Sequence, residues 1–380
     1  MQKTYFIISF FIAVGLLFIF PGVSTAQKEE KALEKVLSSK NLKQIYEIRA
    51  LKIRSISEKN FSSDGSGGIS AIHDNENISA YDASGNLIEN EIISYDRSLK
   101  KHMPVQKWRA SLNPAGLSET ESLYYYDEKQ GGYVESKKWT YEYGPGGNLL
   151  IQTLIDAPSG ELIEKTVNKF DEKNNKIESA YYKGAKLYST TFYKYDENKN
   201  ELESLKTGPD GKIIEKIANS YDQAGLKADT SFYRGPDCVI ERKTTYNRFA
   251  CELDIEKYSG GVLSSTIHNA YDDSGNKTEE TEITAGGKRL YLETYSYDQL
   301  NNLIGKTRYD SANRIEYREA YKYDELNRKI NEYYYGAGGS ELVKSVANKF
   351  NDLRKIEEAS VSDGGQKPVL KTTFTYEYNQ

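Results

Sequence analysis

The sequence predicts an all-β protein: an antiparallel array of repeated hairpins that curls into a spiral, solenoid-like or barrel-like sheet, with a short N-terminal helix. Three observations predict it. An aromatic residue followed by Asp, Asn or Gly returns about every 26 residues from Tyr143 onward. Turn-forming residues separate short runs, so no helical period survives across a repeat. Tyr, which favours strands, occurs 32 times against 12 Phe.

The repeat is regular enough to indicate a chain built by stacking copies of one small unit. Successive anchor pairs lie 25 to 28 residues apart. The pairs are Tyr143-Gly144, Phe170-Asp171, Tyr195-Asp196, Tyr221-Asp222, Tyr246-Asn247, Tyr271-Asp272, Tyr297-Asp298, Tyr323-Asp324, Phe350-Asn351 and Tyr378-Asn379. Such an array predicts a long surface for binding or structure rather than one buried catalytic pocket.

Each unit consists of a turn, a strand, a second turn and a second strand. The clearest first turn is Tyr271-Asp272-Asp273-Ser274-Gly275-Asn276. Its fifth residue suits the left-handed position that closes a type I turn, and its Asp can accept a hydrogen bond from a backbone N–H two residues on. Lys199 and Ala250 occupy that fifth position elsewhere, so we expect strain or a different turn there. Short turns make neighbouring strands antiparallel.

The first 142 residues are expected to differ from the array. Residues 1–26 contain Lys3, an apolar run and Ser24-Thr25-Ala26, which indicates a signal peptide cleaved after Ala26. Residues 27–142 are expected to hold an N-terminal helix cap and irregular first repeats, with the helix ending near residue 46 and a strand from Arg49 to Ser57. From Tyr95 to Tyr126 the period is lost, which indicates an insertion or a degenerate copy. The array proper is expected over 143–380.

Charge and cysteine usage narrow the function. The formal net charge is −5 for the whole chain and −6 once Lys3 is removed, which does not suit nucleic-acid binding. No segment after the signal is apolar enough to span a membrane as a helix. Cys238 and Cys251 lie in successive turns, at opposite ends of a strand of about 26 Å. Bridged Cα atoms must lie within about 7 Å, so we expect two free thiols.

The turn motifs resemble the YD-repeat family, also called RHS-like repeats. Tyr81-Asp82-x-x-Gly85-Asn86 and Tyr271-Asp272-x-x-Gly275-Asn276 carry the resemblance most closely, and it covers roughly 240 to 300 of the residues. It implies an exported bacterial β-repeat protein, located in the periplasm, on the cell surface or outside the cell, and some members are described as carbohydrate-binding or adhesive. The period here is longer than is usual in the family, and the chain is too short for the closed shell of its large toxin-enclosing members.

The candidate ligand-binding residues are aromatic side chains two positions apart, which share a face of a strand. These residues are Tyr193, Tyr195, Tyr295, Tyr297, Tyr321 and Tyr323. In one interpretation they pack the array together. In the other, part of this aromatic ribbon is exposed and stacks on sugar rings or on an aromatic ligand. The expected partners are therefore glycans or another surface protein.

The sequence gives little support for catalysis, so we expect a protein that is not an enzyme and carries no cofactor or metal. His73, His102 and His268 are isolated, without a second ligand at the spacing of a zinc site. One alternative is an enzyme with a site in the region 95–126, supported by His102 and Trp108. Another is an outer-membrane β-barrel. Segments such as Lys212-Ile213-Ile214-Glu215-Lys216 oppose the barrel in a membrane, because they place charge on both faces.

Overall fold

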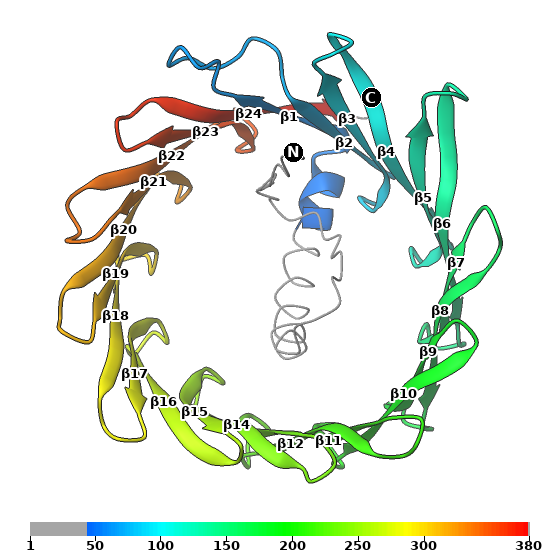
Figure 1. Ribbon diagram of the computed structural model, residues 1–380, viewed down its shortest axis with the longest axis vertical. Coiled ribbons are helices and arrows are strands. Elements are labelled where there is room, and N and C mark those ends of the chain that lie inside the picture. Colours follow the sequence, from blue (N-terminus) through cyan, green and yellow to red (C-terminus); the bar gives the residue numbers. More distant parts are fainter. Residues whose placement is uncertain (1–43, 379–380) are drawn as a thin grey trace, which may run out of the picture.

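The chain forms one closed ring of antiparallel strands (Figure 1). The computed structural model describes residues 44–378, so the expected signal peptide and most of the expected N-terminal helix lie outside the described residues. The strands are β1 (Ile53–Ser62), β2 (Asn75–Tyr81), β3 (Leu87–Asp96), β4 (Lys101–Leu112), β5 (Ser118–Asp127), β6 (Gly132–Tyr143), β7 (Leu149–Asp156), β8 (Leu162–Phe170), β9 (Lys176–Lys183), β10 (Lys186–Tyr195), β11 (Glu201–Thr207), β12 (Ile213–Tyr221), β13 (Lys227–Arg234), β14 (Val239–Tyr246), β15 (Glu252–Ser259), β16 (Val262–Tyr271), β17 (Lys277–Thr284), β18 (Arg289–Tyr297), β19 (Leu303–Asp310), β20 (Ile315–Tyr323), β21 (Lys329–Tyr335), β22 (Leu342–Phe350), β23 (Ile356–Asp363) and β24 (Pro368–Tyr378).

Every strand pairs with the next one along the chain, and the last pairs with the first. The predicted all-β hairpin array is therefore confirmed. The sheet closes as a barrel where β24 meets β1, with Ser57 opposite Thr375 and Glu58 opposite Phe374. Closure removes both free edges of the sheet, which would otherwise be open to pairing with another chain.

The predicted first turn recurs along one rim of the barrel, here called the YD rim. In the copy at Asp272, the backbone N–H of Gly275 donates to the Asp272 carbonyl at 3.0 Å, and the Asp272 N–H donates to the Asn276 carbonyl at 2.9 Å. The Asp272 carboxylate accepts from the backbone of Ser274 and Asn276 at 2.9 and 2.8 Å. The turns of the YD rim are 82–86, 113–117, 144–148, 171–175, 196–200, 222–226, 247–251, 272–276, 298–302, 324–328 and 351–355.

Of the two interpretations for the region between Tyr95 and Tyr126, the structure shows a degenerate copy of the repeat and no insertion that interrupts the sheet. Strands β3 to β6 continue the same pairing without a break, and they also carry the sheet through the expected boundary at residue 142. The period fails there because these strands are longer, at 10 to 12 residues. Tyr95-Asp96 and Tyr126-Asp127 also lie at the opposite rim, while Leu112 takes the place of the anchor aromatic on the YD rim.

Two further details of the termini differ from the prediction. The described part of the helix covers residues 44–50, so Arg49 is helical and the first strand begins at Ile53. The helix does not cap an open end, because a closed ring has none; it lies inside the ring (Figure 1). At the C-terminal end, Tyr376 and not Tyr378 is the anchor, since its hydroxyl donates to the Ile356 carbonyl as that of the anchor Tyr323 donates to Leu303.

The wall is a single layer with solvent-facing residues on both sides. Among the described residues only nine hydrophobic side chains are buried, and the main cluster among them is Ile48, Ile53 and Tyr81, at the seam between β24 and β1. Backbone ladders and cross-strand side-chain pairs therefore hold most of the ring together. Both cysteines are free, as predicted. Within residues 44–378 no helix has the length and apolar content needed to cross a membrane.

Candidate functional site: the lumen wall

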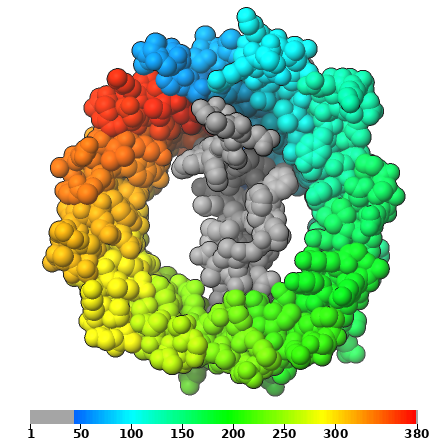
Figure 2. Space-filling model, viewed as in Figure 1, coloured from blue at the N-terminus to red at the C-terminus, as the bar shows by residue number. Residues whose placement is uncertain are grey.

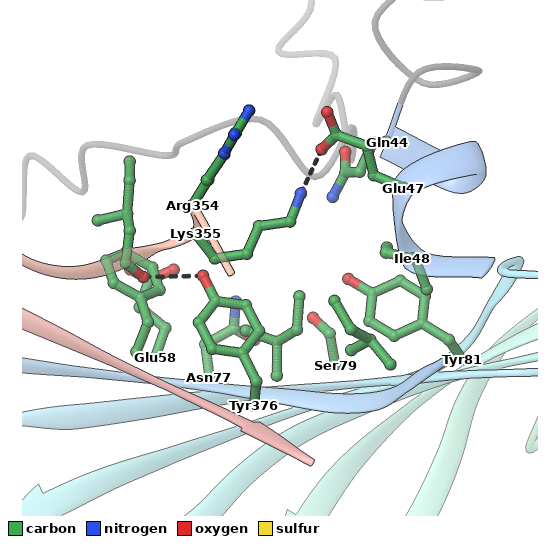
Figure 3. Close-up of a pocket in the computed structure, with 14 residues that line it drawn as sticks. Gln44, Glu47, Ile48, Glu58, Asn77, Ser79, Tyr81, Arg354, Lys355 and Tyr376 are labelled. Carbon is green, nitrogen blue, oxygen red and sulfur yellow. Dashed lines mark hydrogen bonds and ion pairs between the residues drawn. The ribbon is translucent and has the colours of Figure 1, made fainter. Parts of the chain in front are cut away.

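The helix identifies which face of the sheet lines the lumen. Ile48, which is 3% exposed, packs against Tyr81 from inside the ring (Figures 1 and 3). Directly opposed residues of antiparallel strands point to the same side, so this face can be followed from strand to strand. It passes through Asn90, Trp108 and the later anchors, and it returns to Tyr376 opposite Ile56 on β1. All six candidate tyrosines lie on this lumen face.

Three of the six tyrosines tie neighbouring repeats together. The hydroxyls of Tyr195, Tyr297 and Tyr323 donate to backbone carbonyls on the preceding strand, at 2.9, 2.8 and 3.0 Å. The accepting carbonyls belong to Lys176, Lys277 and Leu303, the first residues of β9, β17 and β19. Burial raises the pKa of Tyr297 and of Tyr323. For Tyr195, Tyr297 and Tyr323 the contacts therefore support the interpretation in which the aromatic side chains pack the array together.

The other three tyrosines, Tyr193, Tyr295 and Tyr321, lie two residues farther from the YD rim on the same strands, each beside a lysine. Nζ of Lys176 lies 5.0 Å from the ring centroid of Tyr193, and Nζ of Lys329 lies 4.8 Å from that of Tyr321. Tyr295 has lysine Nζ atoms at 5.7 and 6.0 Å. Burial, together with the Glu201 carboxylate, raises the pKa of Tyr193 to about 12. These half-buried rings, each beside a lysine, are the part of the predicted site that can meet a ligand.

Carboxylates complete the chemistry of this wall, and sequence reasoning missed them. Tyr295 donates to Glu293 at 2.6 Å, Tyr321 donates to Glu319, and Tyr334 donates to Glu332 at 2.7 Å. In these three pairs the acid stands two positions before the tyrosine, so both lie on one face. The pattern Glu-x-Tyr in strands entering the YD rim, as at Glu293 and Glu319, was the available signal.

The densest group is centred on Glu293, which is 4% exposed. Its carboxylate accepts hydrogen bonds from the hydroxyls of Tyr295 and Tyr317, both at 2.6 Å. It also pairs with Lys306 and Arg308, both at 3.0 Å. Burial alone would raise the pKa of Glu293, but these four donors outweigh it and lower the pKa to about 2. The wall is thus charged here, yet every charge is matched.

The residues behind the enzyme alternative are not brought together. His102 stacks on His73, with ring centroids 3.8 Å apart, and it lies opposite Tyr95 on β3. Trp108 lies opposite Asn90 on the same strand. Tyr95 and Asn90 are an odd number of positions apart, so His102 and Trp108 point to opposite faces. Among residues 44–378 no cluster of three His, Cys, Asp or Glu side chains could hold a metal ion.

A separate cavity of about 310 Å³ lies under the helix at the seam, here called the seam pocket (Figure 3). Its floor is formed by side chains of β1, β2 and β24, including Glu58, Tyr81 and Tyr376. Its roof contains an ion pair between Lys355 of the last YD-rim turn and Glu47 of the helix. Sequence reasoning could not find this pocket, because it exists only where the two ends of the sheet meet.

Comparison with known proteins gives only distant structural similarity. No protein-family model and no curated protein sequence matches the chain. The crystal structure of the TcdB2-TccC3 toxin complex without its hypervariable C-terminal region aligns with 80% of this chain and 21% of that one, at 10% identity and a TM-score of 0.31. The Photorhabdus luminescens Tc holotoxin pore covers 76% of this chain and 20% of its own, at 12% identity and a TM-score of 0.28.

A porin-like protein from Bacteroides uniformis covers 86% of this chain and 98% of its own, at 10% identity and a TM-score of 0.24. The chain spans about a fifth of the length of the toxin-complex chains. At these TM-scores the alignments carry no argument about function.

Proposed function

We propose that this protein is a non-catalytic β-repeat ring of the YD type, exported to the bacterial envelope or surface, which binds a glycan on its lumen wall. The single observation that carries the proposal is the closed sheet whose inner face presents Tyr, Glu and Lys side chains. Figure 2 shows this wall as one continuous ring. The geometry of the YD-rim turns supports the family assignment. The signal-like N-terminal sequence supports export.

The chemistry of the wall suits a sugar. A sugar ring offers one apolar face, which stacks on an aromatic ring, and hydroxyls that need both donors and acceptors. Tyr295 supplies the ring and Lys306 beside it a donor, while the buried carboxylate of Glu293 holds both side chains in place. A sugar that stacks on a tyrosine displaces the lysine from the ring, and the lost cation–π contact costs about 0.5–1 kcal/mol. A polymer of sugars offsets this cost, because it can stack on several tyrosines of the wall at once.

The experiment is a glycan-array screen of the mature chain, followed by titration of any sugar that binds. Tyr295→Ala and Tyr321→Ala are expected to weaken binding at least tenfold each, since each removes a lumen ring. Tyr333→Ala is the matched control, because Tyr333 lies opposite Ala320 on the outer face of the same hairpin as Tyr321. Failure of every glycan to bind, or an equal loss in the control, would exclude the proposal.

The outer-membrane alternative is opposed by the outer face of the wall. Lys165, Lys216 and Lys243 stand near the middle of β8, β12 and β14, and each lies opposite an outward residue of the neighbouring strand. A lysine at the bilayer midplane costs about 2–4 kcal/mol, and here that cost would recur around the ring. Retention of the mature chain in solution without detergent is the expected result that separates the two functions.

A further inference from the structure

The seam pocket has the properties of a small binding site that is independent of the lumen tyrosines. Its volume of about 310 Å³ falls in the range of small-molecule pockets. Apolar and aromatic side chains dominate the floor, with Ile53 fully buried and Tyr81 7% exposed. The Tyr376 hydroxyl is held by the Ile356 carbonyl at 2.8 Å, so this ring is fixed before any ligand arrives. The pocket is therefore preorganised.

One acidic side chain in the pocket lacks a cation. Glu58 accepts a hydrogen bond from Asn60 at 3.2 Å, and no ion pair joins it to another of the described residues. Its neighbour Lys59 points to the outer face and pairs with Glu76 at 3.7 Å. Burial raises the pKa of Glu58, although the hydrogen bond from Asn60 acts in the opposite direction. A half-buried carboxylate without a counter-ion gains most from a cationic ligand.

The basic residues of the pocket are not placed to serve Glu58. Lys355 crosses above Tyr376 toward the helix, where its ammonium group pairs with Glu47 (Figure 3). Arg354 comes from the same turn and also belongs to the roof. The pocket thus has a negative, aromatic floor, and its roof holds the Lys355–Glu47 ion pair and the guanidinium group of Arg354. Aromatic rings beside a carboxylate are the surroundings that organic ammonium groups prefer.

We propose that the seam pocket binds a small organic cation, a primary or methylated ammonium group on a compact apolar body, with Glu58 as its counter-ion. The lining rings of Tyr81, Phe374 and Tyr376 supply the aromatic contact. The charge of Glu58 sets the pH dependence: binding is strongest where Glu58 is ionised, and it weakens as falling pH protonates this carboxyl. Of the other charged groups that line the pocket, Glu47 and Lys355 pair with each other and Arg354 stays cationic throughout, so the pH dependence comes from Glu58.

The experiment is calorimetric titration of the full mature chain with choline and with its neutral isostere 3,3-dimethyl-1-butanol. We expect choline to bind at least about tenfold more tightly, which corresponds to about 1.4 kcal/mol. Glu58→Gln is expected to remove this preference. The variant should fold, because burial disfavours the charge that it removes; a far-UV circular dichroism spectrum and a thermal melt check this. Glu76→Gln, on the outer face of β2, is the matched control and should bind choline as the parent does.

Equal binding of the two probes, no binding at millimolar choline, or an unchanged preference in Glu58→Gln would overturn the proposal. The test is separate from that of glycan binding. Tyr295→Ala should leave the choline titration unchanged, and Glu58→Gln should leave glycan binding unchanged, because the two sites lie on different strands.

Discussion

Glu293 is the centre of the densest group of polar contacts on the lumen face. Two tyrosines and two basic residues converge on its carboxylate, and its neighbour across the β17–β18 pair is another acid, Glu280. Like charges directly opposite each other in a sheet repel. Lys306 and Arg308 make the arrangement tolerable, because they place two positive charges on the side away from Glu280. Removal of Glu293 would leave these cations near each other without their shared partner.

Glu293→Ala is therefore expected to lower the free energy of unfolding by about 3 kcal/mol, a magnitude typical of breaking a buried charged network. Urea denaturation at pH 7 measures it. Glu241→Gln is the control, since the partly exposed pair between Arg234 and Glu241 should contribute less than about 1 kcal/mol. A loss no larger than in this control would show that the network contributes little.

The pH dependence of stability follows from the same group. The folded-state pKa of Glu293, about 2, lies below its ordinary value of 4.5. The stabilisation is thus fully present above about pH 4.5 and is lost as the pH falls toward 2; lowering a pKa by one corresponds to about 1.4 kcal/mol. We expect the difference in unfolding free energy between the parent and Glu293→Gln to shrink between pH 4.5 and pH 2. A constant difference across this range would contradict the expectation.

The turn is the element that repeats most faithfully, including where its sequence departs from the motif. Lys199 and Ala250 have φ of 66° and 56°, so they keep the same left-handed turn that Gly275 forms at 82°. The prediction of strain at these two positions is confirmed, since a side chain in this region costs roughly 1–2 kcal/mol. The alternative of a different turn type is not what the chain adopts.

Ala250→Gly is expected to stabilise the protein by about 0.5–1 kcal/mol, because glycine adopts positive φ without the clash of a Cβ atom. Thermal or urea unfolding measures the change. Ala224→Gly is the matched control. Ala224 precedes Gly225 in an equivalent turn and does not have a positive φ. A glycine at this position should therefore destabilise the protein slightly, because it only adds flexibility to the unfolded chain. The prediction is wrong if both variants change stability in the same direction.

The hairpin could be predicted from the sequence because every group that defines it lies within six residues. Asp272, Gly275 and Asn276 make their hydrogen bonds to one another, so the motif alone specifies the turn. Position in the ring is not specified in this way. Tyr309-Asp310 forms the same turn at the opposite rim, with the Asn313 N–H donating to the Asp310 carbonyl at 3.1 Å. A local motif does not distinguish the rims.

Closure and the choice of lumen face could not be predicted, for a related reason. Each pair of strands adds a small twist and tilt, and only their sum over 24 strands decides whether β24 reaches β1. Both faces of each strand also carry polar residues, so alternation does not mark one as inner. Glu58 and Tyr376 meet across the seam although they are far apart in sequence, which explains why the seam pocket left no trace in the pattern.

Closure can be tested with a disulfide across the seam. Ser57 lies directly opposite Thr375, and paired positions in adjacent strands are close enough for a bridge. In a chain carrying Cys238→Ser and Cys251→Ser, the pair Ser57→Cys and Thr375→Cys should oxidise within one molecule, as shown by mass spectrometry and a shift on a non-reducing gel. Ser57→Cys with Ser296→Cys, on the distant β18, should not. Cross-links only between molecules would mean that the ring is open in solution.

The antiparallel seam between β1 and β24 restricts how such a protein can change in size. The chain enters and leaves the barrel at the same rim, so the strand number must be even. A ring of this kind can gain or lose only whole hairpins, and each step alters its circumference by two strand widths, about 9–10 Å. Loss of a single strand would instead bring two parallel strands together at the seam, with a hydrogen-bond pattern unlike that of the rest of the ring. The diameter of the lumen therefore changes in fixed steps of one hairpin. Duplication of a whole repeat is the simplest way to make a wider relative.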